Sequence, residues 1–219
     1  MSFKLPVWRL AGALFPVRCG ACGALGASPC AACAARFERA RSRPLVPALD
    51  RVEVCFEYGG ALRRLLAGLK YRNNRAATEW MAAELAQAWL ERGLEGRLTW
   101  APTTTQRIRH RGFDQSELLA RATASQLRSA GRSVGVERLL WRVAGPAQTG
   151  RNAHQRGGNV HFDTRRPLVG EAVVVIDDVL TTGSTLAAAG AALRGAGAMP
   201  IQGLVLAWRP WVPAPPTRR

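Results

Sequence analysis

Residues 172–186 hold the densest group of side chains in this chain that could bind a charged ligand. An unbroken apolar run at 172–176 predicts a central parallel strand buried on both faces. Two acids, Asp177 and Asp178, follow it directly. Next come the residues called here the hydroxyl loop: Thr181, Thr182, Gly183, Ser184 and Thr185. Ligands of open α/β sheets bind beyond the carboxyl ends of the strands, where these residues would lie.

The two parts of this segment suit the two ends of a sugar phosphate. Unpaired backbone N–H groups at a helix start bind phosphate. Because the helix dipole adds only about 0.3–1 kcal/mol, several N–H and hydroxyl groups must share the binding. A carboxylate pair matches the O–H donors of a sugar diol. Adjacent strand residues point to opposite faces, so Asp177 and Asp178 reach one ligand together only if the strand ends before them. We therefore predict a ribose 5-phosphate site.

Other interpretations of the same segment are weaker. An apolar strand ending in two acids is typical of a Walker B strand, but the chain has no G-x-x-x-x-G-K-[ST] motif. It also lacks the G-x-G-x-x-G motif of a dinucleotide site. The remaining alternative is that the hydroxyl loop only caps a helix.

A second group of reactive residues lies near the N-terminus, where Cys19, Cys22, Cys30 and Cys33 form the pattern C-x2-C-x7-C-x2-C. Two C-x-x-C turns supply four thiolates, which predicts a tetrahedral structural zinc site without an open position for catalysis. Redox chemistry and simple packing of small apolar residues are the alternatives. Cys55 lies in a strand-like pattern and is interpreted as an inert core residue.

The elements that must position these groups alternate between strands and helices, which predicts an α/β fold with a mostly parallel sheet flanked by helices. Apolar patterns place strands at 52–58, 98–101, 139–143, 172–176 and 201–208, and helices at 62–69, 78–92, 114–130 and 184–193. We interpret 106–112 and 145–158 as loops. The expected domains are a cysteine-bearing head at 1–40, the α/β domain at 50–209 and a Pro-rich tail at 210–219.

The chain is strongly basic, with a net charge of +16 and 31 Lys and Arg residues, of which only Lys4 and Lys70 are lysines. This charge predicts attraction to polyanions, including nucleic acids and phosphorylated metabolites. The apolar run at 10–17 is short for a signal peptide, and Arg18 follows it directly, so we expect a cytoplasmic protein without a membrane span.

Residues 172–186 resemble the signature that binds phosphoribosyl pyrophosphate (PRPP) in type I phosphoribosyltransferases. From about Cys19 to Trp208 the chain further resembles the ComF family, which includes GntX-like proteins and is associated with natural competence. The segments that carry this resemblance are the paired C-x-x-C, residues 68–71, residues 109–120 with the sequence Arg-His-Arg-Gly-Phe-Asp-Gln, and Gln148, Arg156 and Asn159. Asp114 stands where the family mostly has Asn.

The resemblance implies a phosphoribosyltransferase acting on PRPP with Mg²⁺, in addition to structural Zn²⁺. Asp177 and Asp178 would hold the ribose hydroxyls, and the hydroxyl loop would hold the 5-phosphate. Arg107, Arg109 and Arg111 offer forked donors for a diphosphate, with Arg109 and Arg111 stabilising the leaving charge. Lys70 is a further candidate phosphate ligand, and Gln148, Arg156 and Asn159 would belong to a loop that closes over the site.

Two other functions stay open at this point. One is a non-catalytic module of the DNA-uptake machinery that senses PRPP or a nucleotide and binds single-stranded DNA, with competence proteins such as the DNA-uptake helicase as partners. The other is nucleobase salvage, which the four-cysteine head disfavours. The sequence does not identify the acceptor base.

Overall fold

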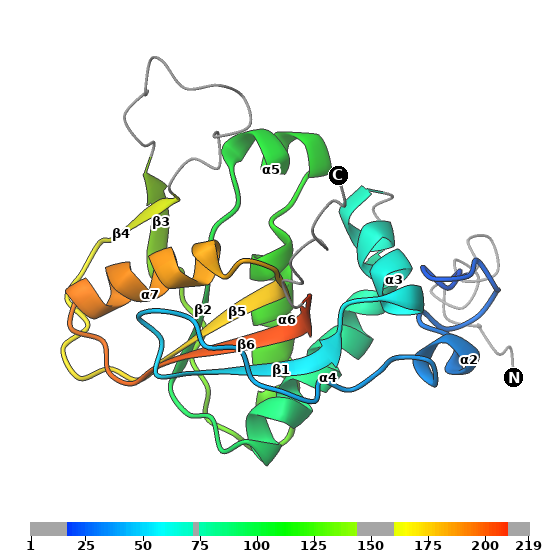
Figure 1. The fold of residues 1–219 in the computed structure, drawn as a ribbon, viewed down its shortest axis with the longest axis horizontal. Coiled ribbons are helices and arrows are strands. Elements are labelled where there is room, and N and C mark those ends of the chain that lie inside the picture. Colours follow the sequence, from blue (N-terminus) through cyan, green and yellow to red (C-terminus); the bar gives the residue numbers. More distant parts are fainter. Residues whose placement is uncertain (1–16, 72–74, 144–159, 210–219) are drawn as a thin grey trace, which may run out of the picture.

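Four parallel strands form the central sheet, in the order β1-β6-β5-β2 (Figure 1). The structure is a computed structural model that describes residues 17–71, 75–143 and 160–209. The strands are β1 (Arg51–Glu57), β2 (Arg97–Trp100), β5 (Val173–Leu180) and β6 (Ile201–Trp208). Because all the pairings are parallel, the carboxyl ends of these strands lie at one edge of the sheet.

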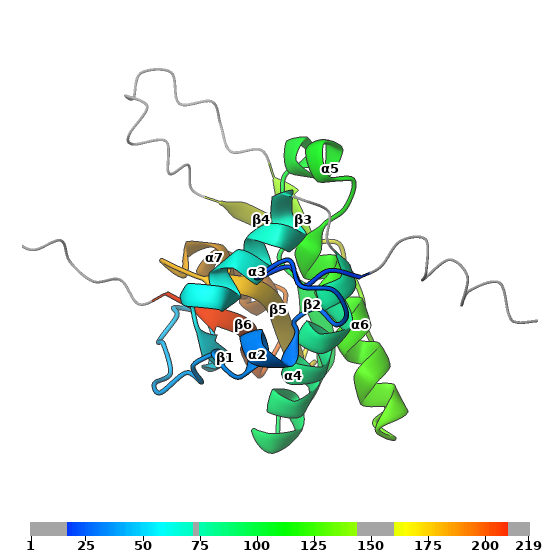
Figure 2. The same ribbon diagram turned by 90° about the vertical axis from the view of Figure 1, so that its right-hand side faces the viewer.

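Helices cover both faces of this sheet. Figure 2 shows α7 (Ser184–Gly195) on one face, and α4 (Thr78–Glu91) and α6 (Gln115–Ser129) on the other. Val174 and Ile176 of β5 pack in the cluster that contains α4 and α6, whereas Val173 and Val175 pack in the cluster that contains α7. No helix within the described ranges has the length and apolar character needed to span a bilayer.

A second sheet of two antiparallel strands, β3 (Leu140–Val143) and β4 (His161–Thr164), stands beside the short helix α5 (Thr105–Arg111) (Figure 1). The other elements of the described ranges are α2 (Ala31–Ala34), α3 (Gly60–Tyr71) and the 3-10 turn η1 (Arg75–Ala77). The predicted α/β class with a parallel sheet and flanking helices is confirmed.

The described part of the cysteine segment packs against the α/β domain. Cys19 and Cys33 are buried in the same hydrophobic cluster as Leu62 of α3. The Nε of Arg64 donates to the carbonyl oxygen of Ala21 at 2.9 Å, which ties α3 to the first C-x-x-C turn. The cysteine segment therefore shares its core with the sheet, while the domain boundaries at 40, 50 and 209 stay a prediction.

Two expectations about the elements were wrong. Residues 106–112 are not a loop, because α5 spans most of them: the Thr104 hydroxyl accepts from the Arg107 N–H at 3.3 Å at its start, and Gly112 ends it with a φ of 80°. The strand expected at 172–176 continues to Leu180, because β6 pairs with β5 as far as Trp208. Its last residues, Val179 and Leu180, supply apolar side chains to the two core clusters.

Residues 40–50, called here the linker, cross from the cysteine segment to the start of β1. Asp50 fixes the linker's end, because its carboxylate accepts from the buried Ile201 N–H at 2.6 Å and pairs with Arg194 of α7 at 2.9 Å. The Ile201 N–H and the Arg194 guanidinium hold the pKa of Asp50 below its usual value, against the opposing effect of burial.

We expect Asp50→Ala to lower the free energy of unfolding by about 1–3 kcal/mol at neutral pH, because it leaves a buried N–H without its acceptor. The ionic part of this stabilisation is present above about pH 4 and is lost as the pH falls through the lowered pKa of the folded protein. Urea unfolding from pH 7 to pH 3 measures it, with Asp50→Asn, which keeps an acceptor oxygen, as the matched variant. An Asp50→Ala penalty that stays constant down to pH 3 would contradict this role.

Candidate functional site

The acid pair lies in the carboxyl-terminal half of β5. The Asp177 carboxylate accepts from the Ser116 hydroxyl of α6 at 3.0 Å and from the Asp178 N–H at 2.9 Å. Asp177 is partly buried, and Asp178 is only 7% exposed. A strand and a helix start that are 61 residues apart in the sequence thus meet at the Asp177 carboxylate.

The acids do not follow the end of the strand, as the sequence suggested. The ladder pairs Asp177 with Val205 and Val179 with Ala207, so both acids lie inside β5. Both carboxylates could approach one diol equally only if the strand ended before Asp177. That condition is not met. Asp177 is the more exposed of the two, and its contact with Ser116 directs it toward α6.

The hydroxyl loop connects β5 to α7. Gly183 is the N-cap residue with a φ of 78°, a left-handed conformation that favours glycine. The Ser184 N–H donates to the Thr182 hydroxyl oxygen at 3.4 Å, and the two hydroxyls lie 3.1 Å apart. Thr181, Thr182 and Ser184 are exposed, and the first turn of α7 carries no acid. Exposed hydroxyls at the start of a 12-residue helix can bind an anion.

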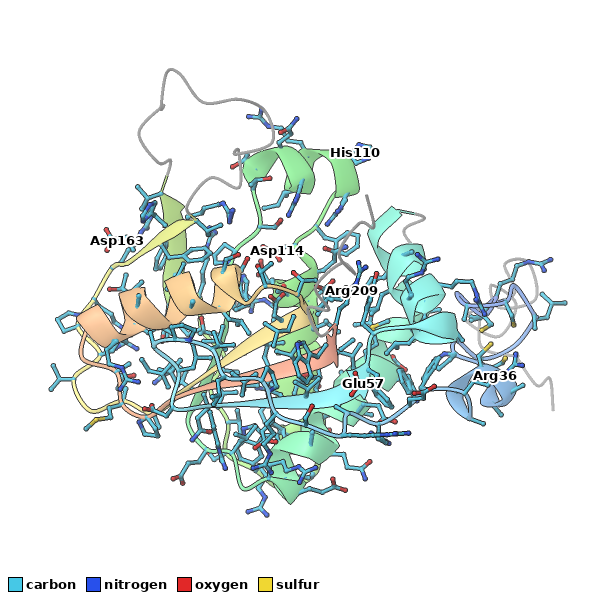
Figure 3. The ribbon with its side chains drawn as sticks, in the orientation of Figure 1. Arg36, Glu57, His110, Asp114, Asp163 and Arg209 are labelled. Atoms are coloured by element: carbon cyan, nitrogen blue, oxygen red, sulfur yellow. The ribbon has the colours of Figure 1, made fainter. Side chains whose placement is uncertain are left out.

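The start of α6, which follows the arginine-bearing helix α5, lies beside the acids. Asp114, 7% exposed, caps α6 by accepting from the Ser116 N–H at 3.0 Å, and it also accepts from the Thr103 N–H at 2.8 Å. Burial raises the pKa of Asp114, and these N–H groups partly offset the effect. Figure 3 shows Asp114 between α5 and the strand ends. The capped helix start holds Ser116 in reach of Asp177.

The helical form of 105–111 separates the three arginines. Arg107 and Arg111, four residues apart, share one side of α5, whereas Arg109 lies on roughly the opposite side. Arg111 donates to the Gln115 side-chain oxygen at 2.7 Å, which places it next to Ser116 and the acids. Arg107 lies close enough to Arg142 of β3 to lower the pKa of Arg142, after the larger effect of burial. The three guanidinium groups therefore do not converge as a loop would allow.

The four head cysteines lie together, with all their sulfur atoms within 4.8 Å of one another. The Cys22 and Cys30 sulfurs are 3.7 Å apart, close to the spacing of about 3.8 Å that follows from four tetrahedral Zn–S bonds of about 2.3 Å. Although burial opposes it, N–H groups directed at the sulfur, foremost that of Cys30, lower the pKa of Cys19 to about 6. The cluster fits a structural zinc site.

Comparison with known proteins identifies relatives of this chain. DNA utilization protein YhgH of Salmonella typhimurium is 30% identical over 164 residues, which cover 71% of this chain and 71% of that protein. The protein of the same name from Escherichia coli K12 is 29% identical over the same shares. The chain belongs to the ComF family.

No family model matches the sequence. Among solved structures, a hypoxanthine-guanine phosphoribosyltransferase from Bacillus anthracis aligns with 63% of this chain and 74% of its own, with 18% identity and a TM-score of 0.42. A purine phosphoribosyltransferase from Pyrococcus horikoshii aligns with 64% and 78%, with 19% identity and a TM-score of 0.39.

The ComF segments have different positions in the structure. The Arg-Gly-Phe segment forms the end of α5 and the start of α6, and Asp114 makes there the capping bonds that the family's Asn can also make. Lys70 lies near the end of α3, but its side chain is outside the described residues, as are Gln148, Arg156 and Asn159. Cys55 is buried, and burial raises the pKa of its thiol to about 12, as expected for an inert core cysteine.

Sequence reasoning missed two contributors to the site. Ser116 was not singled out because its bond to Asp177 depends on how α6 meets β5, and no local pattern encodes that. The linker was treated only as a connection, yet Val46 packs beside Gly183, 3.4 Å from the position that a Cβ would take there. Two apolar residues between Pro44 and Pro47 were the available signal.

Proposed function

We propose that this ComF protein binds PRPP at the carboxyl edge of its sheet and transfers the phosphoribosyl group. The observation that carries the proposal is the junction of the acid-bearing strand β5 with the exposed hydroxyl loop and the start of α7. Of the two acids, the more accessible Asp177 would accept from the ribose hydroxyls, and the hydroxyl loop would bind the 5-phosphate.

The arginines of α5 suit the diphosphate end of PRPP. Arg111 lies next to the acid pair through Gln115 and Ser116 and is the best placed of the three, with Arg107 on the same side of the helix. Pyrophosphate would leave C1 of the ribose with the electron pair of the C–O bond, and guanidinium groups would stabilise its charge. Mg²⁺, bound chiefly by the diphosphate oxygens, would neutralise part of that charge.

The double variant Asp177→Asn/Asp178→Asn is expected to weaken binding of magnesium-PRPP by about 10- to 100-fold, because the loss of one charge-assisted hydrogen bond, that of Asp177, costs about 1.5–3 kcal/mol. Isothermal titration calorimetry measures it. Asn at position 177 keeps an oxygen for the Ser116 hydroxyl, so the local structure is preserved. Asp163→Asn, which changes an exposed acid on β4, is the control and should bind as wild type does. Affinity within twofold of wild type in the double variant would refute the assignment.

We also propose that the four head cysteines bind one structural Zn²⁺. The close sulfur cluster supports this, and two of its members, Cys19 and Cys33, belong to the main core cluster. The metal would then hold the head against α3 and stabilise the whole domain.

Purified protein is expected to contain one zinc per chain by plasma mass spectrometry. Cys33→Ser should lose the metal and lower the melting temperature, because four thiolates hold the ion and one of them is removed from a buried position. Cys55→Ser is the matched control: it also changes a buried cysteine, but one outside the cluster, and should keep the zinc. Metal-free protein with wild-type stability would rule out a structural zinc.

A second candidate function, binding of single-stranded DNA, is favoured by the surface of the β3–β4 ribbon. The guanidinium of Arg165 lies 4.3 Å from the centre of the Trp141 ring, and that of Arg138 lies 5.5 Å from it. Trp141 is partly buried, and both arginines are exposed. In proteins that bind single-stranded DNA, bases stack on aromatic rings, and arginines beside the rings bind the DNA backbone. The name of the YhgH relatives, which refers to DNA utilization, agrees with this function.

If the ribbon binds single-stranded DNA, Trp141→Leu should weaken binding of a fluorescent oligo(dT) by about tenfold through the loss of one stacking contact. Arg165→Gln should reduce the slope of log affinity against log salt by about 0.7 for each lost phosphate contact. Fluorescence anisotropy over a salt series measures both. Arg132→Gln, an exposed arginine after α6, serves as control. Equal affinities and slopes in all three variants and wild type would exclude the ribbon as the DNA surface.

A further inference from the structure

Val46 of the linker packs at the start of α7. It is buried in the core cluster that also contains Leu180, the last residue of β5, and Leu186 of α7. A Cβ added at Gly183 would lie 3.4 Å from one Val46 methyl group and 3.7 Å from the other. Val46 therefore packs where the chain turns from β5 through the hydroxyl loop into α7.

Leu49 anchors the linker three residues further along. Its side chain fills a notch between Gly203 of β6 and Gly190 of α7: a Cβ at Gly203 would lie 2.9 Å from the Leu49 Cδ2, and one at Gly190 would collide with the Leu49 Cδ1. A Cβ at Gly190 would also lie only 2.9 Å from the Ala48 carbonyl oxygen. The absence of a side chain at both glycines therefore lets the linker lie directly on α7 and β6.

The backbone beside Leu49 is held by α7 as well. Ala48 has a φ of 66°, a left-handed conformation that is unfavourable for a residue with a Cβ. The Arg194 guanidinium donates to the Ala48 carbonyl oxygen at 3.2 Å and to the Asp50 carboxylate at 2.9 Å. Such a backbone conformation persists only where its surroundings determine it. The linker is thus fixed near the end of α7 and packs, through Val46, on its start.

We propose that the linker positions the hydroxyl loop for the phosphate of a sugar phosphate, with Val46 and Leu49 as positioning residues that do not touch the ligand. The inference rests on the proposed function, because the hydroxyl loop is the proposed 5-phosphate site. The Thr182 and Ser184 side chains are exposed, and among the described residues they bond only within their own loop. Packing by the linker therefore keeps the hydroxyls and the N–H groups of the helix start directed at one phosphate, so that less order has to be gained on binding.

Ribose 5-phosphate and magnesium pyrophosphate probe the two ends of the proposed PRPP site separately. The first carries the phosphate assigned to the hydroxyl loop, and the second resembles the group assigned to the arginines of α5. In calorimetric titrations of the full chain, Val46→Ala should raise the Kd for ribose 5-phosphate about five- to tenfold and change that for magnesium pyrophosphate by less than about twofold. Val46→Ile should bind both probes as wild type does, because the added methyl group has room in an adjoining cavity of about 500 Å³.

Val134→Ala is the control for a general loss of core packing. Val134 is 7% exposed, as Val46 is, but it belongs to the other core cluster. The variant should lower the Tm about as much as Val46→Ala does and leave the Kd of both probes unchanged.

Gly190→Ala tests the positioning from a distance. The added methyl group would displace Ala48 and Leu49, yet it lies seven residues after Gly183, about 10 Å along the helix from the hydroxyl loop. It should raise the Kd for ribose 5-phosphate at least about threefold, although alanine favours a helix more than glycine does. Gly195→Ala changes the same helix where a Cβ meets open space, and it should bind as wild type does.

The two proposals fail in different ways. If wild type binds PRPP and ribose 5-phosphate, and Val46→Ala and Gly190→Ala bind ribose 5-phosphate as tightly, the positioning inference is overturned and PRPP binding stands. Equal weakening of both probes by Val46→Ala, or equal weakening by Val134→Ala, would also overturn it. If Val46→Ala does not fold, Gly190→Ala decides. If wild type binds neither PRPP nor ribose 5-phosphate, the proposed function fails, and the positioning role fails with it.

Discussion

The parallel pairing of β5 with β6 on one side and β2 on the other is the constraint on which the rest of the structure depends. Residues 173–176 of β5 are completely buried and alternate between two core clusters, so their register against β6 and β2 is fixed. A shift by one residue would exchange the side chains between the clusters and move Asp177 away from Ser116. The position of the acid pair relative to α6 is therefore a consequence of core packing.

Charge is distributed between the two edges of this sheet in different ways. At the amino edge, Glu137 and Glu171 pair with Arg97 at the start of β2 and with Arg166, in a network of four side chains. At the carboxyl edge, Arg111 of α5 donates to Gln115, and the next residue, Ser116, donates to Asp177 of the acid pair. With 31 basic and 15 acidic residues, the chain has a net charge of +16, which attracts anions to the protein as a whole.

The fold could be predicted where packing follows a local period. The strand at 201–208 and the helix at 78–92 were predicted almost to the residue. The first is an apolar run typical of a buried strand, and the apolar residues of the second recur along one face of a helix. The helix at 105–111 could not be predicted in this way, since it buries no side chain and is defined by its caps, Thr104 and Gly112. Nor does β propensity favour two aspartates inside a strand; pairing with the eight-residue β6 overrides it.

The candidate site could likewise be predicted only where its residues are neighbours in the sequence. Hydroxyl loop and acids form one continuous segment, so their proximity follows from the sequence. Contacts between distant segments do not follow from it. Ser116 donates to Asp177 although 61 residues separate them in the sequence, and Val46 of the linker packs beside Gly183. These contacts depend on which strands become neighbours, a property of the whole topology rather than of any local pattern.

The linker shows how the head and the site can depend on each other. Its first residue is held to β1, where the Ala40 N–H donates to the Cys55 carbonyl oxygen at 3.1 Å. Its last residue, Asp50, bonds to Ile201 of β6 and Arg194 of α7. Between these anchors only nine residues remain, 41–49, so their path along the sheet is short and determined at both ends. The cysteine cluster packs on α3 immediately before the first anchor. A metal that holds the head in place would thus also hold one end of the segment whose Val46 packs beside Gly183 of the hydroxyl loop, and would affect ligand binding there indirectly, without any contact between metal and ligand.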